Sequence, residues 1–125
     1  MFELKVLTHF AAAHQLKMVT EKCENLHGHN WKIEACVSGP ELDDAGVLMD
    51  FGELKNHVNA IVDRLDHHFL NDLEYFNNGL NPSSENIAVL IAGQLSQSLA
   101  GKPVRVSRVS VWESDNACAT YTPDH

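Results

Sequence analysis

Three histidines in the sequence have a spacing that suits a metal site. His27 and His29 flank a glycine, and on a strand their side chains would point to the same face, because strand side chains alternate. A third histidine, His14, ends an earlier strand-like run. Neutral imidazole nitrogens suit zinc, and the pattern lacks the carboxylates that calcium or magnesium prefer. Three imidazoles with an open fourth position predict a catalytic zinc site, and a turn with two exposed histidines is the alternative.

Cys23 lies four residues before His27 and supports two interpretations. It could be the fourth ligand of a closed structural site, or it could stand beside an open site as a base or nucleophile. Its polar neighbours in residues 21–25 argue against a buried apolar role. The other two cysteines, Cys36 and Cys118, fall in strand-like runs and are expected to be packing residues. An odd number of cysteines predicts reduced thiols rather than a disulfide framework.

Asp66 and His67 form a second candidate pair. A carboxylate beside an imidazole can fix its tautomer and raise its basicity, but a polar loop that ends the preceding helix is the alternative. Glu113 ends an apolar strand beside Trp112. Its carboxylate is either exposed to solvent or a specific acceptor, since two oxygens match the paired N–H edge of an amino-pyrimidinone ring.

The apolar pattern predicts four strands and two helices that must position these residues. Strands are expected from residue 2 towards 14 and over 31–37, 104–113 and 117–122, with helices over 51–64 and from 81–85 to 101. Asp50 and Glu53 form a capping signature for the first helix. The order ββααββ predicts an α+β domain with both helices on one face of an antiparallel sheet. Its two open edges favour edge-to-edge self-association.

Composition limits the classes of function. A chain of 125 residues predicts a single domain over 1–125, and the net charge of −8 argues against nucleic-acid binding. No apolar run approaches the ~20 residues that span a bilayer, which argues against a membrane protein. The N-terminus alternates and carries an acid, so it does not resemble a signal peptide, and a cytoplasmic location is expected.

Six motifs, in order along nearly the whole chain, resemble those of the 6-pyruvoyltetrahydropterin synthase/QueD family. They are Phe10-Ala11-Ala12-Ala13-His14, Cys23-x-x-x-His27-Gly28-His29, Met49-Asp50-Phe51-x-x-Leu54-Lys55, Leu65-Asp66-His67-x-x-Leu70-Asn71, Asn81-Pro82-Ser83-Ser84-Glu85-Asn86 and Trp112-Glu113-Ser114. Ser114 stands where the family usually has threonine. Because the hydroxyl is kept, any hydrogen bond it makes is expected to survive.

The resemblance implies the tunnelling fold (T-fold), with protomers assembled as a homohexamer, a dimer of trimers, and active sites between subunits. It also implies roles for individual residues. Zn²⁺ would be held by His14, His27 and His29, Cys23 would abstract a proton, Asp66 and His67 would form its partner dyad, and Glu113 with Ser114 would anchor the pterin.

The implied activity is that of a lyase, 6-carboxytetrahydropterin synthase, which acts on a pterin triphosphate in queuosine biosynthesis. The spacing between Cys23 and His27 is the form typical of QueD. Two alternatives stay open. One is a 6-pyruvoyltetrahydropterin synthase, which eliminates triphosphate without carbon–carbon cleavage, and the other is a non-catalytic module stabilised by zinc. Lys17 or Lys22 could contribute a cation for the triphosphate.

Overall fold

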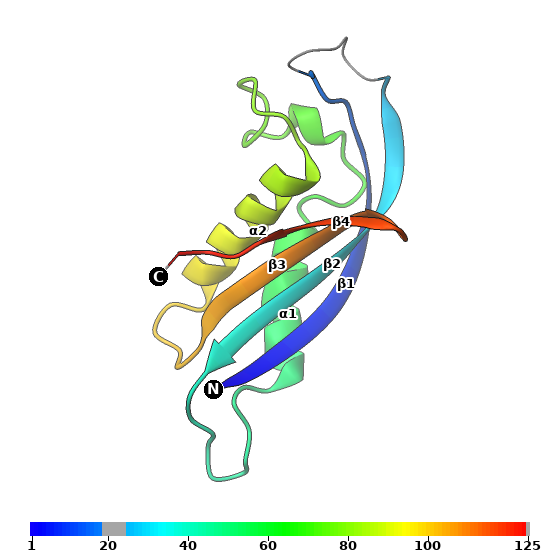
Figure 1. The fold of residues 1–125 in the computed structure, drawn as a ribbon. Coiled ribbons are helices and arrows are strands. Elements are labelled where there is room, and N and C mark those ends of the chain that lie inside the picture. Colours follow the sequence, from blue (N-terminus) through cyan, green and yellow to red (C-terminus); the bar gives the residue numbers. More distant parts are fainter. Residues whose placement is uncertain (19–24, 125) are drawn as a thin grey trace.

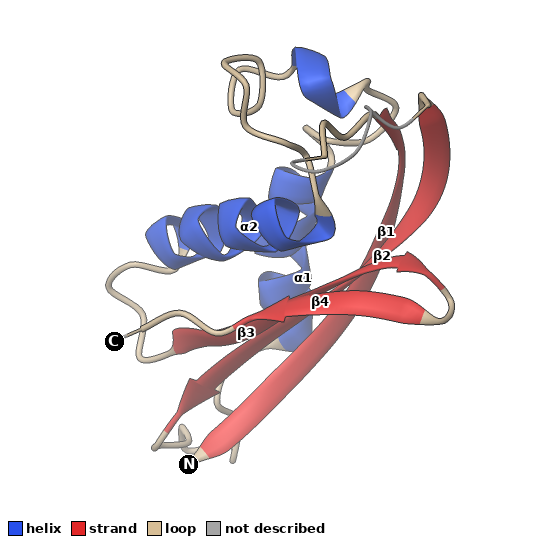
Figure 2. Cartoon of the chain, turned by 45° about the horizontal axis from the view of Figure 1, so that its top comes forward, coloured by secondary structure: helices blue, strands red, loops and turns tan. Residues whose placement is uncertain are grey.

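The computed structural model describes residues 1–18 and 25–124, which form one antiparallel sheet with both helices on one face (Figures 1 and 2). The sheet order is β1-β2-β3-β4, so β1 and β4 are its edges. The elements are β1 (Phe2–His14), β2 (His27–Gly39), α1 (Phe51–Val62), the short 3₁₀ helix η1 (Leu70–Asp72), α2 (Ser84–Ser98), β3 (Arg105–Ser114) and β4 (Ala117–Tyr121). The predicted order ββααββ and the α+β class are confirmed.

The long hairpin of β1 and β2 sets the framework of the sheet. The two strands pair without interruption from Phe2 opposite Gly39 to His14 opposite His27. The second strand therefore starts four residues before the predicted start at Trp31. The prediction missed this stretch because its alternating polar residues carry no apolar signal, although the pairing with β1 makes it a strand.

The core lies between the sheet and the helices. Alternate residues of β1 and β2 face the helices and are buried, including Val6, Phe10, Ala12, Trp31 and Ile33. Each Leu, Ile or Val buried in this way stabilises the fold by roughly 1.5–3 kcal/mol relative to an exposed side chain. The same alternation carries His14 to the helix-facing side, where its side chain is 1% exposed.

Side-chain caps fix where both helices begin. The Asp50 carboxylate accepts the N–H of Glu53 at 2.9 Å, as the capping signature predicted. Ser83 caps α2 in the same way, through the N–H of Asn86 at 3.1 Å. After α2, Gly101 has a φ of +85°, a left-handed conformation that suits glycine at a helix end.

The segment after α1 binds the outer edge of β1. The Asp66 carboxylate accepts the N–H of Ala11 at 2.8 Å, and the N–H of His67 donates to the Ala11 carbonyl at 2.6 Å. Two residues on, Ala13 donates its N–H to the carbonyl of His68 at 3.2 Å. These bonds fix the Asp66-His67 motif at the sheet edge, next to the end of β1 that carries His14.

The structure tests two of the three cysteine predictions. Cys36 is buried, as expected of a packing residue. Cys118 is exposed, so its predicted packing role is wrong for the protomer, because β4 is a mostly exposed edge strand. Cys23 lies outside the described residues. Among the described residues, no helix is long and apolar enough to cross a membrane.

Gly39 provides a direct test of packing at the end of β2. A Cβ there would lie 2.7 Å from both Leu48 Cδ1 and the Pro103 carbonyl oxygen, whereas a Cβ on Gly93 in α2 would meet nothing within 4 Å. We expect Gly39→Ala to lower the free energy of unfolding by about 1–3 kcal/mol through overpacking. The matched variant Gly93→Ala should raise it by about 0.5–1 kcal/mol, because alanine favours a helix. Urea denaturation measures both, and equal effects would contradict the packing at Gly39.

Candidate metal centre

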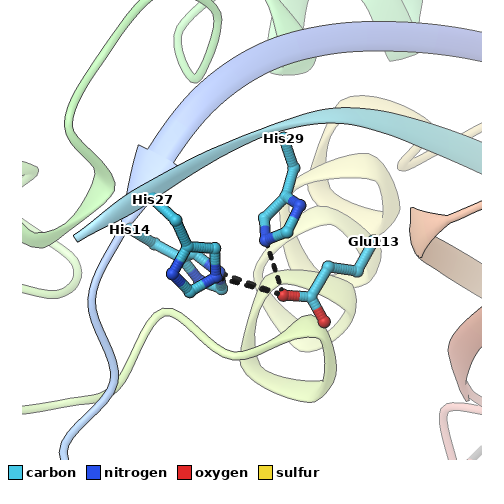
Figure 3. Close-up of side chains that lie close together, drawn as sticks. All are labelled: His14, His27, His29 and Glu113. Atoms are coloured by element: carbon cyan, nitrogen blue, oxygen red, sulfur yellow. Dashed lines mark hydrogen bonds and ion pairs between the residues drawn. The ribbon is translucent and has the colours of Figure 1, made fainter. Parts of the chain in front are cut away.

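Three histidines and one glutamate converge at one end of the sheet, on the face that the helices cover. His14 comes from the end of β1, His27 and His29 from the start of β2, and Glu113 from the end of β3. Figure 3 shows the three imidazoles and the carboxylate turned towards one another. One ligand atom from each residue lies within 4.8 Å of all the others. Strand register makes this cluster, because His14 lies directly opposite His27.

The closest atoms in the cluster are Nε2 nitrogens and one carboxylate oxygen. Oε1 of Glu113 lies 3.1 Å from Nε2 of His14, 2.9 Å from that of His29 and 3.7 Å from that of His27. The Nε2 atoms of His14 and His27 are 3.1 Å apart. Four potential ligand atoms therefore surround one small volume.

Backbone carbonyls determine which nitrogen of two rings carries the proton. His14 Nδ1 lies 2.8 Å from the Pro82 carbonyl, and His27 Nδ1 lies 2.7 Å from the Asn25 carbonyl. A carbonyl only accepts, so each Nδ1 donates its hydrogen, and in the neutral ring Nε2 keeps a lone pair. Two lone pairs 3.1 Å apart repel each other unless a cation or a proton lies between them. A second bond that orients the ring through Nδ1 is typical of histidines that bind metals.

The third imidazole supports a metal rather than a shared proton. Nε2 of His29 is buried and has no assigned hydrogen-bond partner among residues 1–18 and 25–124, although Oε1 of Glu113 lies 2.9 Å away as an ion-pair contact. Burial lowers the pKa of His29, which favours the neutral ring although nearby Glu113 acts in the opposite direction. One proton could satisfy only one pair of atoms, whereas one metal ion could bind all three nitrogens. The residues present therefore fit a metal ion.

Glu113 corrects one sequence-based expectation. The histidine pattern was expected to lack a carboxylate, but β3 brings Glu113 to the three rings. Glu113 is distant from them in sequence, so only the pairing of β3 with β2 could have revealed this contact. Three imidazoles and one carboxylate are a donor set that suits zinc.

Asp66 and His67 lie outside the histidine cluster. Asp66 Oδ2 is 3.4 Å from Nε2 of His67, so the two side chains do form a pair. His67 has a φ of +59° and a side chain that is 81% exposed. An open hollow of about 540 Å³ is bordered by both His67 and His29, along with neighbouring residues of β1 and β2.

The remaining predicted site residues lie around this end of the sheet. Ser114 is exposed, and its Oγ accepts the N–H of Asn116 at 3.3 Å in the turn between β3 and β4. Gly28 lies between the two histidines of β2. A Cβ there would be 4.0 Å from the nearest atom, so the described protomer does not require glycine at this position. Cys23 and Lys22 lie outside the described residues.

Comparison with known proteins agrees with this geometry. The 6-pyruvoyl tetrahydropterin synthase family model matches residues 3–124. A putative 6-carboxy-5,6,7,8-tetrahydropterin synthase from Archaeoglobus fulgidus is 37% identical over 114 residues, which cover 91% of this chain and 90% of the relative. A dihydroneopterin monophosphate aldolase from Pyrococcus furiosus is 40% identical over 106 residues, covering 85% and 84%.

The fold has a solved counterpart. The 6-pyruvoyl tetrahydropterin synthase of Caenorhabditis elegans superposes with a TM-score of 0.84 at 24% identity, covering 98% of this chain and 96% of that one. At this identity the likeness concerns the fold alone, and it confirms the tunnelling fold. The sequence matches confirm the family resemblance: the chain belongs to the 6-pyruvoyl tetrahydropterin synthase family, whose members are lyases.

Proposed function

We propose that the protein is a zinc-dependent 6-carboxy-5,6,7,8-tetrahydropterin synthase of queuosine and 7-deazaguanine biosynthesis. It would convert 7,8-dihydroneopterin triphosphate and water to 6-carboxytetrahydropterin, acetaldehyde and triphosphate. The observation that carries the proposal is the convergence of the Nε2 atoms of His14, His27 and His29, two of which have Nδ1 engaged by a backbone carbonyl. Similarity to relatives that carry this enzyme's name supports the choice of reaction.

Zinc at the three nitrogens would polarise the side-chain oxygens of the pterin and acidify the adjacent C–H and O–H groups. Pro82 and Asn25 hold the rings of His14 and His27 through their carbonyls, so these two ligands need no reorientation. Trp31 packs edge-on against His14, with ring centroids 4.9 Å apart, and limits the movement of that ring. The protein's contribution here is a set of three nitrogen donors, two of them oriented by backbone carbonyls.

Cys23 is the proposed base that takes the proton from the substrate. It lies four residues before His27 in the sequence, so the chain tethers it to a metal ligand. A thiolate is a better base than a thiol, and a nearby cation favours the thiolate. His67, oriented by Asp66, would pass protons to and from the intermediate.

Self-association would explain the position of the Asp66-His67 pair. In one protomer the His67 side chain is exposed and outside the histidine cluster, so it is available to a site on a neighbouring subunit. The sheet has two edge strands, β1 and β4, through which subunits could pair. We propose a homohexamer built from two trimers, acting in the cytoplasm.

Two other reactions are alternatives. A 6-pyruvoyltetrahydropterin synthase would remove triphosphate without breaking a carbon–carbon bond. The second alternative is a dihydroneopterin monophosphate aldolase, which would act on the monophosphate. It is favoured by the 40% identity to a protein of that name. Both alternatives use the same pterin class, so the site geometry alone does not separate them.

Identification of the products by mass spectrometry distinguishes these reactions. The protein loaded with zinc should convert dihydroneopterin triphosphate to 6-carboxytetrahydropterin, with acetaldehyde released in equal amount. A pyruvoyl product without acetaldehyde would replace the proposal with the first alternative. Turnover of the monophosphate only would replace it with the aldolase.

Cys23→Ala separates catalysis from a structural zinc site. If Cys23 is the base, the variant should keep its zinc content and thermal midpoint while turnover falls by about 10²–10⁴-fold, the usual contribution of a general base. Elemental analysis, a thermal melt and the product assay measure the three properties. Loss of zinc together with unfolding would instead support a closed site with Cys23 as the fourth ligand, because structural zinc contributes folding energy.

Glu113→Gln tests which role the carboxylate has. As the proposed anchor of the pterin, Glu113 accepts two N–H groups, and an amide can accept only one of them. We therefore expect KM to rise about tenfold, equivalent to about 1.4 kcal/mol, with the zinc content unchanged. Loss of zinc from this variant would show instead that the carboxylate acts as a metal ligand. Ser107→Ala is a control, because Ser107 bonds to Glu3 away from the site.

A further inference from the structure

Two asparagine side chains bind the backbone just beyond the end of β1. Asn71 Oδ1 accepts the N–H of Gln15 at 2.9 Å, and its Nδ2 donates to the Gln15 carbonyl at 2.7 Å. Asn81 makes the same pair of bonds with Lys17, at 2.9 and 2.7 Å. Each side-chain amide thus makes the two hydrogen bonds that a residue of a neighbouring strand would make.

These bonds continue the row at the outer edge of β1. Ala11 and Ala13 bond along this edge to residues 66–68, and Gln15 and Lys17 follow at the same two-residue interval. Alternate residues of an extended chain direct their N–H and C=O groups to the same side. On its other edge, β1 pairs with β2 as far as His14. Beyond His14, the two asparagines make strand-like hydrogen bonds with the backbone of Gln15 and Lys17.

The second asparagine is also connected to the metal centre. Asn81 precedes Pro82, whose carbonyl accepts the Nδ1 hydrogen of His14 at 2.8 Å. The carbonyl of Asn81 accepts a hydrogen bond from Nδ2 of Asn86 in α2 at 2.8 Å. Asn81 therefore joins three parts of the site: the start of α2, the backbone after His14 and the carbonyl that orients the His14 ring.

We propose that Asn71 and Asn81 are positioning residues that hold the backbone after His14 and, through it, the direction of His14 Nε2. The inference rests on the proposed role of His14 as a metal ligand. His14 lies between the bond at Ala13 and the bonds at Gln15, so its backbone is fixed on both sides. Asn81 has the larger effect of the two, because it also positions the Pro82 carbonyl.

An Asn81→Asp variant removes the donor while keeping the size and the acceptor. A carboxylate oxygen would then face the Lys17 carbonyl, and the two would repel each other. We expect the affinity for zinc, measured by competition with a chelator, to fall about tenfold, the lower end of the effect of groups that orient a ligand. The visible spectrum of the Co²⁺-substituted protein should shift, and hydrogen exchange at the Lys17 amide should accelerate.

Asn71→Asp should accelerate exchange at Gln15, with a smaller loss of zinc affinity. Asn78→Asp is the matched control, because Asn78 is exposed in the same segment and takes no part in these bonds. This control should leave the zinc affinity, the Co²⁺ spectrum and hydrogen exchange at Gln15 and Lys17 unchanged. If Asn81→Asp does not fold by circular dichroism, Asn81→Ser, which removes the amide without adding a charge, is measured in its place.

The proposal would be overturned if Asn81→Asp accelerated exchange at Lys17 but left the zinc affinity and the Co²⁺ spectrum unchanged. The asparagines would then only anchor a loop. None of these measurements uses a substrate. An unexpected product from the wild-type protein would therefore refute the proposed reaction without affecting this test, and a failure of this test would leave the reaction in place.

Discussion

The register of β1 against β2 is the constraint on which the rest of the structure depends. It places His14 opposite His27 and, by alternation, sends His29 and the core residue Trp31 to the same face. A slip of one residue would turn every side chain of one strand to the other face. The core and the histidine cluster would then be lost together, so the same pairing determines both stability and the site.

The core and the cluster are in direct contact as well. Trp31 is fully buried, and its ring lies edge-on to both His14 and His29, with centroids 4.9 and 5.3 Å away. Its indole N–H donates to the Ala12 carbonyl at 3.2 Å, which fixes the ring against β1. The histidines therefore form the end of a packed layer, and their orientation is maintained by the same contacts that exclude water from the core.

The sequence predicted the features that depend on neighbouring residues, namely the faces of the strands and the start of the first helix. Alternation identified the faces of the strands, and Asp50 identified the start of α1, because a cap acts over only three residues. The family resemblance placed Glu113 in the same site as a pterin anchor, but its contact with the three rings was missed, since that contact depends on how β3 pairs with β2. The hydrogen bonds of Asn71 and Asn81 to the backbone after His14 were missed for a similar reason. Each joins residues more than 50 positions apart, and the sequence around a loop asparagine does not indicate its partner.

One protomer holds the proposed metal ligands but presents the proposed proton relay to solvent. The bonds of Asp66 and His67 to Ala11 fix their position at the edge of β1, so the pair cannot turn towards the cluster without breaking them. Ala11 lies three positions before His14 on the same strand, and the two side chains lie on opposite faces. A neighbouring subunit that paired with β1 would lie beside the relay, because residues 66–68 bind the end of that edge. Within one protomer the relay meets the metal ligands only across the open hollow that His67 and His29 border, so a neighbouring subunit that covered this hollow would close the site.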